Sequence, residues 1–268
     1  MSYIDAHYNR EEDKVRVVER DKKGQRKFVD YDARYVFYYP DSRGKHRSIY
    51  GEQLQKVQCN TWKQFIKEQK IRSNKKLYEQ DINPVFRCLE ENYLGKETPK
   101  VNTVFFDIEV DFDPKRGYST TDDPFMPITA ITCYLSWTDQ LVTFAVPPKT
   151  LNMSGAKMAT ERFENVMLFE KEKDMLDAFL TLIDDADILS GWNSEGYDIP
   201  YTVGRIQKVL SSDDTRRLCF WGAKPKRRTF EKYGREQLSY DLIGRVHLDL
   251  LELYRKYTYE ERHSYRLD

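Results

Sequence analysis

The sequence predicts an α/β protein in two parts, a small α+β domain over residues 1–100 and a larger domain with a mixed sheet over residues 101–268. Three observations predict this organisation. The first part contains alternating strands and an amphipathic helix, whereas the second reads as three strands, a helix, a strand and a helix. A turn-rich linker, residues 94–100, lies between them. The length of 268 residues also suits two domains, since one domain takes roughly 100 to 200 residues.

The first part opens with two alternating strands, residues 14–20 and 26–31, joined through the turn-forming run 21–24. Such a pair with glycine at its turn is typical of a β-hairpin. We expect residues 34–39 to add a third strand to the same small antiparallel sheet, because Pro40 ends the run.

An amphipathic helix follows these strands. Asn60 or Thr61 can cap its start, because a side-chain oxygen there can accept a hydrogen bond from a backbone N–H of the first turn. Apolar and basic side chains fall on opposite sides of this helix: Trp62, Phe65 and Ile66 on one, Lys63, Lys67 and Lys70 on the other. The tyrosines and lysines of this part could bind nucleic acid. An aromatic core with a solvated face is the interpretation that the sequence favours.

The second part is organised around the apolar strand 104–110, which carries two carboxylates. Side chains in a strand repeat every second residue, so Asp107 and Glu109 project from one face while Phe106 and Ile108 pack on the other. Two unit charges ~4 Å apart repel by about 4 kcal/mol at an effective dielectric of 20. The pair therefore requires a cation, a shared proton or solvent, and a divalent metal ion satisfies this requirement.

Residues 128–137 and 141–146 predict two further strands, which make a three-stranded meander with the acid-bearing strand. We expect a surface loop over residues 149–164. Apolar residues at helical spacing then predict a helix over about 176–183.

A short buried strand is predicted at residues 188–193, followed by a loop and a helix that begins at Asp198 with Pro200 in its first turn. Residues 216–242 are strongly basic, and we expect a protruding hairpin there that contacts DNA. Residues 246–251 predict the last strand.

Cysteine spacing and hydropathy argue against several classes of protein. The cysteines Cys59, Cys88, Cys133 and Cys219 form no C-x-x-C pair, which argues against a zinc cluster and a disulfide framework and favours reduced, cytoplasmic thiols. No signal peptide is evident at the start, and no run approaches the ~18 apolar residues of a membrane span. We therefore expect a soluble, intracellular protein without a membrane partner.

The two parts differ in charge. Residues 1–100 hold 22 basic against 16 acidic residues, and residues 101–268 hold 22 against 28. This asymmetry suggests nucleic acid for one face and metal-binding acids in the other part. Ordinary scatter of surface charge explains the composition equally well.

Two motifs, in this order along the chain, resemble those of a known protein family. Phe106-Asp107-Ile108-Glu109 resembles the first exonuclease motif of the family B DNA polymerases, and the run from Gly191 through Asp198 to Tyr201 is similar to the second. Residues 244–250 and 264–267 resemble the stretch that leads towards the third motif. The arrangement of residues 1–100 is most similar to the T-even phage type. The resemblance covers nearly the whole chain, weakly before residue 100.

The resemblance implies a ribonuclease-H-like 3′-5′ exonuclease domain that removes nucleotides from the primer 3′ end of DNA. Two Mg²⁺ or Mn²⁺ ions would activate water and stabilise the phosphate in this chemistry. By resemblance, Asp107 would bridge both ions, Glu109 would bind the water-activating ion, and Asp198 would hold the other. Asn193 and Tyr197 would position the loop or the strand end.

The basic hairpin would resemble the family's element that helps to part primer from template. The residues that we expect to contact DNA there are Arg227, Arg228, Tyr233 and Arg235. A phage-encoded protein of this kind would work in the host cytoplasm.

The family's third motif, a Tyr before a further metal-binding Asp, does not occur in residues 1–268, nor do the polymerase motifs. Asp249 and Asp268 match a strand end and a helix start instead, so we do not assign either as the missing ligand. We expect weak binding of single-stranded DNA and impaired hydrolysis by this chain alone. The alternative is a non-catalytic nucleic-acid-binding or assembly module that docks to the remaining polymerase portion. RNA binding by residues 1–100 stays open.

Other site classes fit less well. An EF-hand around Asp107 to Asp113 fails because Phe112 or Pro114 stands where the loop needs glycine. No hydrolase nucleophile or glycine-rich phosphate loop is present. We expect His247 to be a satisfied core residue rather than a catalytic one.

Overall fold

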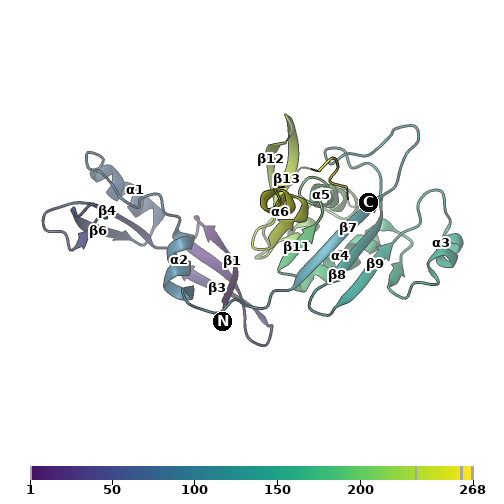
Figure 1. The fold of residues 1–268 in the computed structure, drawn as a ribbon, viewed down its shortest axis with the longest axis horizontal. Helices are drawn as coiled ribbons and strands as arrows, with labels where there is room; N and C mark the ends of the chain where they lie inside the picture. Colours follow the sequence, from purple (N-terminus) through teal and green to yellow (C-terminus); the bar gives the residue numbers. More distant parts are fainter. Residues whose placement is uncertain (1, 233, 260–261, 267–268) are drawn as a thin grey trace. The chain divides into compact units, whose positions relative to one another are not determined.

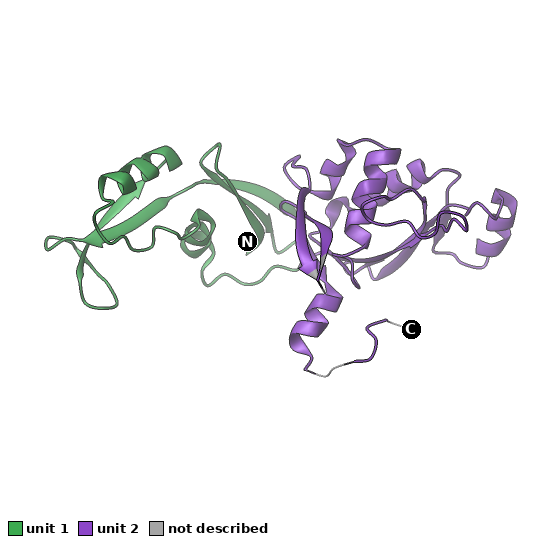
Figure 2. Ribbon diagram, turned by 90° about the horizontal axis from the view of Figure 1, so that it is seen from above, with its two compact units in different colours: residues 1–100 green, residues 101–268 purple. Residues whose placement is uncertain are grey.

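The computed structural model describes residues 2–232, 234–259 and 262–266, and the chain divides into two compact units, residues 1–100 and 101–268 (Figure 2). Each unit contains its own cluster of buried hydrophobic side chains. The functional roles that the sequence suggests for the two parts stay predictions.

The first unit contains two three-stranded antiparallel sheets and two helices. One sheet has the order β1-β2-β3, and the other has the order β4-β6-β5. The elements are β1 (Ser2–Asn9), β2 (Lys14–Arg20), β3 (Arg26–Asp32), β4 (Tyr35–Pro40), β5 (His46–Arg47), β6 (Gln53–Cys59), α1 (Trp62–Ile71) and α2 (Pro84–Tyr93). Helix α1 begins as expected, because the Thr61 side chain accepts a hydrogen bond from the Gln64 amide.

The prediction that residues 34–39 join the hairpin sheet is wrong. Strand β4 pairs with β6, with Phe37 opposite Val57, in a separate sheet. Only two residues separate β3 from β4, and the Ala33 amide donates to the Asp13 carbonyl at 2.8 Å, which fixes the chain in a turn at the end of the first sheet. Strand β1, which the sequence analysis missed, pairs with β2 and occupies the edge opposite β3.

The second unit is built on a six-stranded mixed sheet with the order β10-β9-β8-β7-β11-β14 (Figure 1). Its strands are β7 (Thr103–Val110), β8 (Ile128–Leu135), β9 (Gln140–Ala145), β10 (Val166–Leu168), β11 (Ile188–Gly191) and β14 (Val246–Asp249). Strands β7, β8 and β9 form the expected antiparallel meander, whereas β11 runs parallel to both β7 and β14. The predicted mixed α/β architecture is confirmed.

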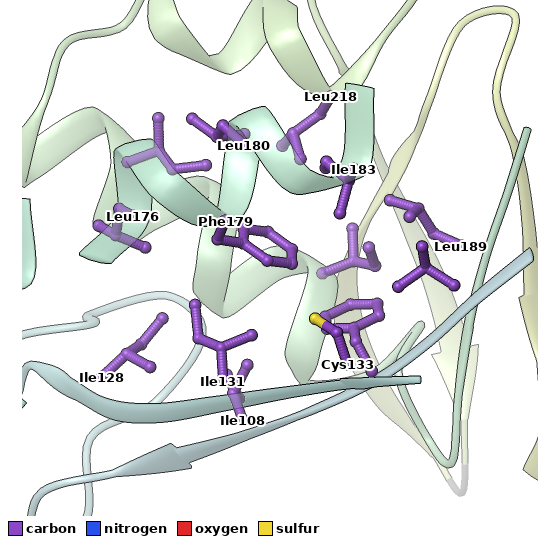
Figure 3. Close-up of a cluster of buried hydrophobic side chains, with 14 of the residues drawn as sticks. Ile108, Ile128, Ile131, Cys133, Leu176, Phe179, Leu180, Ile183, Leu189 and Leu218 are labelled. Carbon is purple, nitrogen blue, oxygen red and sulfur yellow. The ribbon is translucent and has the colours of Figure 1, made fainter. Parts of the chain in front are cut away.

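Helices α4 (Glu172–Leu182) and α5 (Asp198–Val209) supply the main buried layer against this sheet. Figure 3 shows Leu176 and Phe179 of α4 on the side of the helix that faces Ile108, Ile131 and Cys133, whereas Leu180 lies near Leu218. The apolar side chains of α4 recur at i, i+3 and i+4, so they all reach this core. The acid-bearing strand β7 is therefore fixed by a fully packed layer on one side.

Two local expectations need correction or extension. Residues 149–164, expected to be a loop, contain helix α3 (Met153–Thr160), because the Asn152 side chain accepts a hydrogen bond from the Gly155 amide and so caps its start.

The basic hairpin is present as β12 (Lys226–Lys232) and β13 (Arg235–Asp241). All four cysteines are unpaired thiols in buried positions. Among the described residues, no helix is both long and apolar enough to cross a membrane.

Candidate active site

Strand β7 presents its two acids on one face. Phe106 and Ile108 are buried, whereas Phe105, Asp107 and Glu109 are exposed, which confirms the alternation expected from the sequence. The buried residues anchor the strand in the core, so the positions of the two carboxylates are set by packing beneath them.

The second motif lies next to β7 at the point where the pairing between β7 and β11 ends. The β7–β11 ladder ends at the pair Ser190 and Phe105, which leaves the following part of β7 without a strand neighbour on that side. The Asp198 carboxylate takes this place and accepts a hydrogen bond from the Ile108 amide at 3.2 Å. A side chain at the start of α5 thus reaches the backbone between the two acids of the first motif.

Asp198 is only 4% exposed, and its surroundings disfavour its charge. Burial, followed by repulsion from Asp107, raises the pKa of Asp198 from 3.8 to about 7. Loss of solvent also raises the pKa of Asp107. The structure therefore places two carboxylates close enough to repel each other, as a cation-binding site requires.

The loop before α5 is held in a defined conformation. Asn193 adopts a left-handed backbone with φ 59°, which Asn tolerates better than most residues. Its carbonyl accepts hydrogen bonds from the amides of Gly196 and Tyr197, both at 3.1 Å. The loop is consequently a closed turn that brings Tyr197 and Asp198 to the strand.

Asp249, at the end of β14, holds this turn through its side chain. Its carboxylate accepts hydrogen bonds from the amides of Asn193 and Glu195 at 3.1 and 3.0 Å. It also accepts from Leu251 and Glu252 and so caps helix α6 (Leu250–Tyr257). Through these bonds Asp249 positions the backbone of both the turn and the start of α6.

His247 also supports the turn. Its Nε2 atom lies 2.9 Å from the Ser194 hydroxyl, and burial lowers the pKa of the imidazole. The hydrogen bond agrees with the satisfied histidine that the sequence predicted here.

Tyr197 completes one wall of the site. Its ring stacks on Tyr201 with a centroid distance of 5.3 Å. Burial, with smaller effects from Tyr201, Asp198 and Glu109, raises the pKa of Tyr197 to about 12. The phenol is therefore protonated at neutral pH and can donate a hydrogen bond.

An open pocket of about 520 Å³ joins these groups. Among its lining residues are the predicted site residues Asp107, Asn193, Tyr197 and Asp198, together with Trp192, Arg255, His263 and Arg266. Glu109 does not line this pocket, although its charge acts on Tyr197. The structure thus brings four of the predicted residues to one cavity.

The donor set for a metal ion is sparse. Among the described residues there is no cluster of three or more His, Cys, Asp or Glu side chains placed to hold a metal ion. Asp107 and Asp198 remain a mutually repelling pair beside a cavity, which is a chemically suitable but incomplete oxygen-ligand set.

A larger pocket of about 730 Å³ lies in the first unit and is rich in carboxylates. One of these, Asp13, accepts hydrogen bonds from the Tyr35 hydroxyl and the Trp62 amide and so has a structural role. We therefore place the candidate active site at the smaller pocket.

Comparison with known proteins identifies the family of this chain. Residues 48–268 match the family described as DNA polymerase family B, exonuclease domain. The chain belongs to this family. The family resemblance recognised in the sequence is thereby confirmed, and the candidate site lies within the matched residues.

Three relatives support this assignment. The chain is 27% identical to the DNA-directed DNA polymerase of Escherichia phage RB69, over 90% of this chain and 29% of that protein. It is 31% identical to the polymerase of Enterobacteria phage T4 over 38% of this chain and 12% of that protein. The DNA polymerase delta catalytic subunit of Bos taurus is 30% identical over 33% of this chain and 9% of that protein. The chain spans less than a third of the length of these family B relatives.

The hairpin residues of this family B chain differ in their surroundings. Arg227 is exposed, whereas Arg228 forms an ion pair with Glu195 and lies 2.7 Å from Asp241. Tyr233 lies outside the described residues, and of Arg235 only the backbone pairing with Lys232 is described. Arg228 therefore has a structural partner next to the site loop, and Arg227 is the more accessible of the two.

Sequence reasoning missed contacts among other residues that line the pocket beside Asp107 and Asp198. The Trp192 indole donates to the Tyr265 carbonyl at 2.7 Å, and the Arg255 guanidinium lies 4.5 Å from the Tyr265 ring centre. The Trp192–Tyr265 contact joins residues seventy-three positions apart, so no local pattern could reveal it. The one signal that the sequence offered was Asp249, which stands where its side chain can cap a helix over residues 250–257.

Proposed function

We propose that this chain is the amino-terminal and 3′-5′ exonuclease portion of a replicative DNA polymerase, with a ribonuclease-H-like active site at Asp107, Glu109 and Asp198. The observation that carries the proposal is the position of Asp198, which accepts a hydrogen bond from the Ile108 amide between the two acids of β7 and whose pKa is raised by burial and then by Asp107. Family membership supports the same reaction class. The substrate would be the primer 3′ end or single-stranded DNA.

Asp107 and Asp198 would hold Mg²⁺ or Mn²⁺, and Glu109 would contribute from the neighbouring position on β7. Two such ions would supply water activation and charge stabilisation at the scissile phosphate. The carboxylates are fixed before substrate arrives, because Asp107 stands on a packed strand and Asp198 is held by a backbone amide. Such preorganisation lowers the cost of assembling the charged site.

Asn193 and Tyr197 would position the terminal nucleotide. Both line the pocket beside the acids, and the protonated Tyr197 phenol can donate to a phosphate or sugar oxygen. Arg227, Arg228, Tyr233 and Arg235 would contact the DNA strand along the hairpin. We infer that the remaining polymerase portion is a partner and that the protein works in the host cytoplasm.

We infer reduced activity of the chain alone, because three carboxylates, Asp107, Glu109 and Asp198, would hold two ions. The alternative is a non-catalytic nucleic-acid-binding or assembly module of the polymerase. The two proposals differ in whether nucleotides are released.

The test is release of a labelled 3′ nucleotide from single-stranded DNA in Mg²⁺ or Mn²⁺, compared with Asp107→Ala. Asp174→Ala, an exposed carboxylate on α4, is the matched control. We expect slow release that Asp107→Ala abolishes and Asp174→Ala leaves intact. Release at full polymerase-like rate would contradict impaired activity, and no release even with the remaining polymerase portion added would exclude the enzyme in favour of the binding module.

A further inference from the structure

An open groove of about 640 Å³ runs along helix α1 in the first unit. On its other side the helix packs against strands β4 and β6 (Figure 1), and Phe65 is buried there in the core of the unit. The groove therefore lies on the side of α1 that the first unit leaves uncovered. We call the residues that line it the α1 groove: Trp62, Lys63, Ile66, Lys67, Lys70 and Ile71.

The apolar part of the α1 groove contains accessible aliphatic surface. Ile71, the last residue of the helix, is 61% exposed. Ile66 and Trp62, one turn apart, are partly buried against the core of the unit and also line the groove. Such surface gains free energy when an apolar side chain of a partner removes it from water.

Three lysines form a row along the groove. Lys63, Lys67 and Lys70 stand at i, i+4 and i+7, so they are neighbours on the helix surface. All three are exposed, and none of them forms a salt bridge with a described residue. The one acid of the helix, Glu68, is paired with Arg72 instead. The row thus carries positive charge that carboxylates at a similar helical spacing would neutralise.

We propose that the α1 groove docks an acidic amphipathic helix of a separate partner protein. Apolar side chains of that helix cover Ile66 and Ile71, and its Asp or Glu side chains pair with the lysine row. Recognition of an amphipathic helix through anchors at i, i+3, i+4 and i+7 is a recurrent mode of peptide binding. The groove is confined to one side of one helix and is lined by charge, which suits a transient partner, since permanent interfaces are larger and more apolar.

A nucleic acid strand fits the α1 groove less well than such a helix. Bases bind single-strand sites by stacking on accessible aromatic rings. Trp62 is the one aromatic residue of the groove, and its ring already lies 5.6 Å from that of Phe65 and 4.5 Å from the Arg10 guanidinium. The aliphatic side chains of the groove offer no π-face to a base, whereas they suit the apolar side chains of a peptide.

The test selects random peptides, longer than the ten residues of α1, on the full chain in EDTA. The counter-target is the charge-reversed variant Lys63→Glu, Lys67→Glu, Lys70→Glu. We expect the selected peptides to combine Asp or Glu with apolar residues at helical spacing. Their affinity, measured by fluorescence anisotropy, should fall at least about tenfold in the charge-reversed variant, because three ion pairs become like-charge contacts. It should fall about threefold in Ile71→Gln, which loses an apolar contact at an exposed position.

A gain of binding separates charge recognition from damage to the fold. A selected peptide whose acids are replaced by Lys should bind the charge-reversed variant more tightly than the unmodified chain, which an unfolded variant could not do. The matched control reverses the same charge at exposed positions in or beside the β2–β3 turn and should retain the acidic peptides: Lys22→Glu, Lys23→Glu, Lys27→Glu.

Equal weakening in both triple variants would overturn the proposal, because net charge alone would then explain binding. So would a selection that yields no peptide dependent on the lysine row, or an unchanged affinity in Ile71→Gln. Displacement of the peptides by oligothymidylate, with oligothymidylate binding lost only in the charge-reversed variant, would assign the groove to nucleic acid. Displacement by the remaining polymerase portion would assign it to a contact within the polymerase. None of these measurements involves nucleotide release, so their failure is distinct from failure of the exonuclease proposal.

Discussion

Substitution of Asp198 by Asn should stabilise the metal-free protein at neutral and alkaline pH. In the folded chain the pKa of Asp198 is about 7, against 3.8 for an ordinary aspartate. Three pKa units correspond to roughly 4 kcal/mol of unfavourable free energy when the group is ionised, at 1.36 kcal/mol per unit. Asn can keep the hydrogen bond from the Ile108 amide through its side-chain oxygen, while it removes the charge that Asp107 repels.

The sign of the pH dependence follows from the raised pKa. Below pH 4 the carboxyl is protonated in both folded and unfolded chains, so it has no effect on stability. Between pH 4 and 7 the folded chain binds more protons than the unfolded chain, so the stability of the wild type falls as the pH rises. Above pH 7 the full penalty applies, and the variant should exceed the wild type by its maximum.

The measurement is urea unfolding in EDTA at several pH values, followed by tryptophan fluorescence. Trp137, Trp192 and Trp221 lie in the second unit and only Trp62 in the first, so the signal reports mainly on the unit that contains the site. The free-energy difference between variant and wild type isolates Asp198 from other titrating groups. Asp174→Asn controls for the change of chemistry at an exposed position. A difference that is independent of pH, or that grows as the pH falls, would refute the reasoning.

Three further outcomes concern structural residues around the site. Asp249→Ala should lower the free energy of unfolding by at least about 2 kcal/mol, measured in urea, because a helix cap and the anchor of the site loop are lost together; an effect below 0.5 kcal/mol would contradict this role. Arg205→Ala should cost about 3 to 5 kcal/mol, since it leaves the buried Glu172 carboxylate without its ion partner, and Arg205→Ala combined with Glu172→Gln should recover part of the loss. Gly191→Ala should cost about 1 to 3 kcal/mol in thermal unfolding, because the new Cβ would lie 2.6 Å from the Phe106 carbonyl oxygen, and a neutral result would show that the β7–β11 junction relaxes freely.

Periodicity predicted the elements that form the second unit. The acid-bearing strand alternates strictly, and α4 and α5 carry apolar residues at helical spacing, so local pattern and final environment agree. The site residues Asp107 and Asp198 could be selected because each stands at a position that its own element defines. That Asp107 and Asp198 lie close together could be predicted only from the family resemblance, because ninety positions separate Asp198 from Ile108.

Strand pairing in the first unit could not be read in the same way. Strand β4 buries Tyr35, Val36 and Phe37 in succession, so alternation gave no indication of its partner. Its pairing with β6 is set by a turn at Ala33 and by contacts with α1, which are tertiary. Helix α3 was missed because it spans only eight residues, with Ser154, Gly155 and Thr160 among them, and the Asn152 cap decides its start.

The shared carboxylate of Asp249 has a mechanical consequence. One side chain holds both the first turn of α6 and the turn at Asn193, so the two cannot shift independently without breaking a buried hydrogen bond. A shift of the first turn of α6 would therefore also break the hydrogen bonds that hold the turn at Asn193, and this turn brings Asp198 to strand β7.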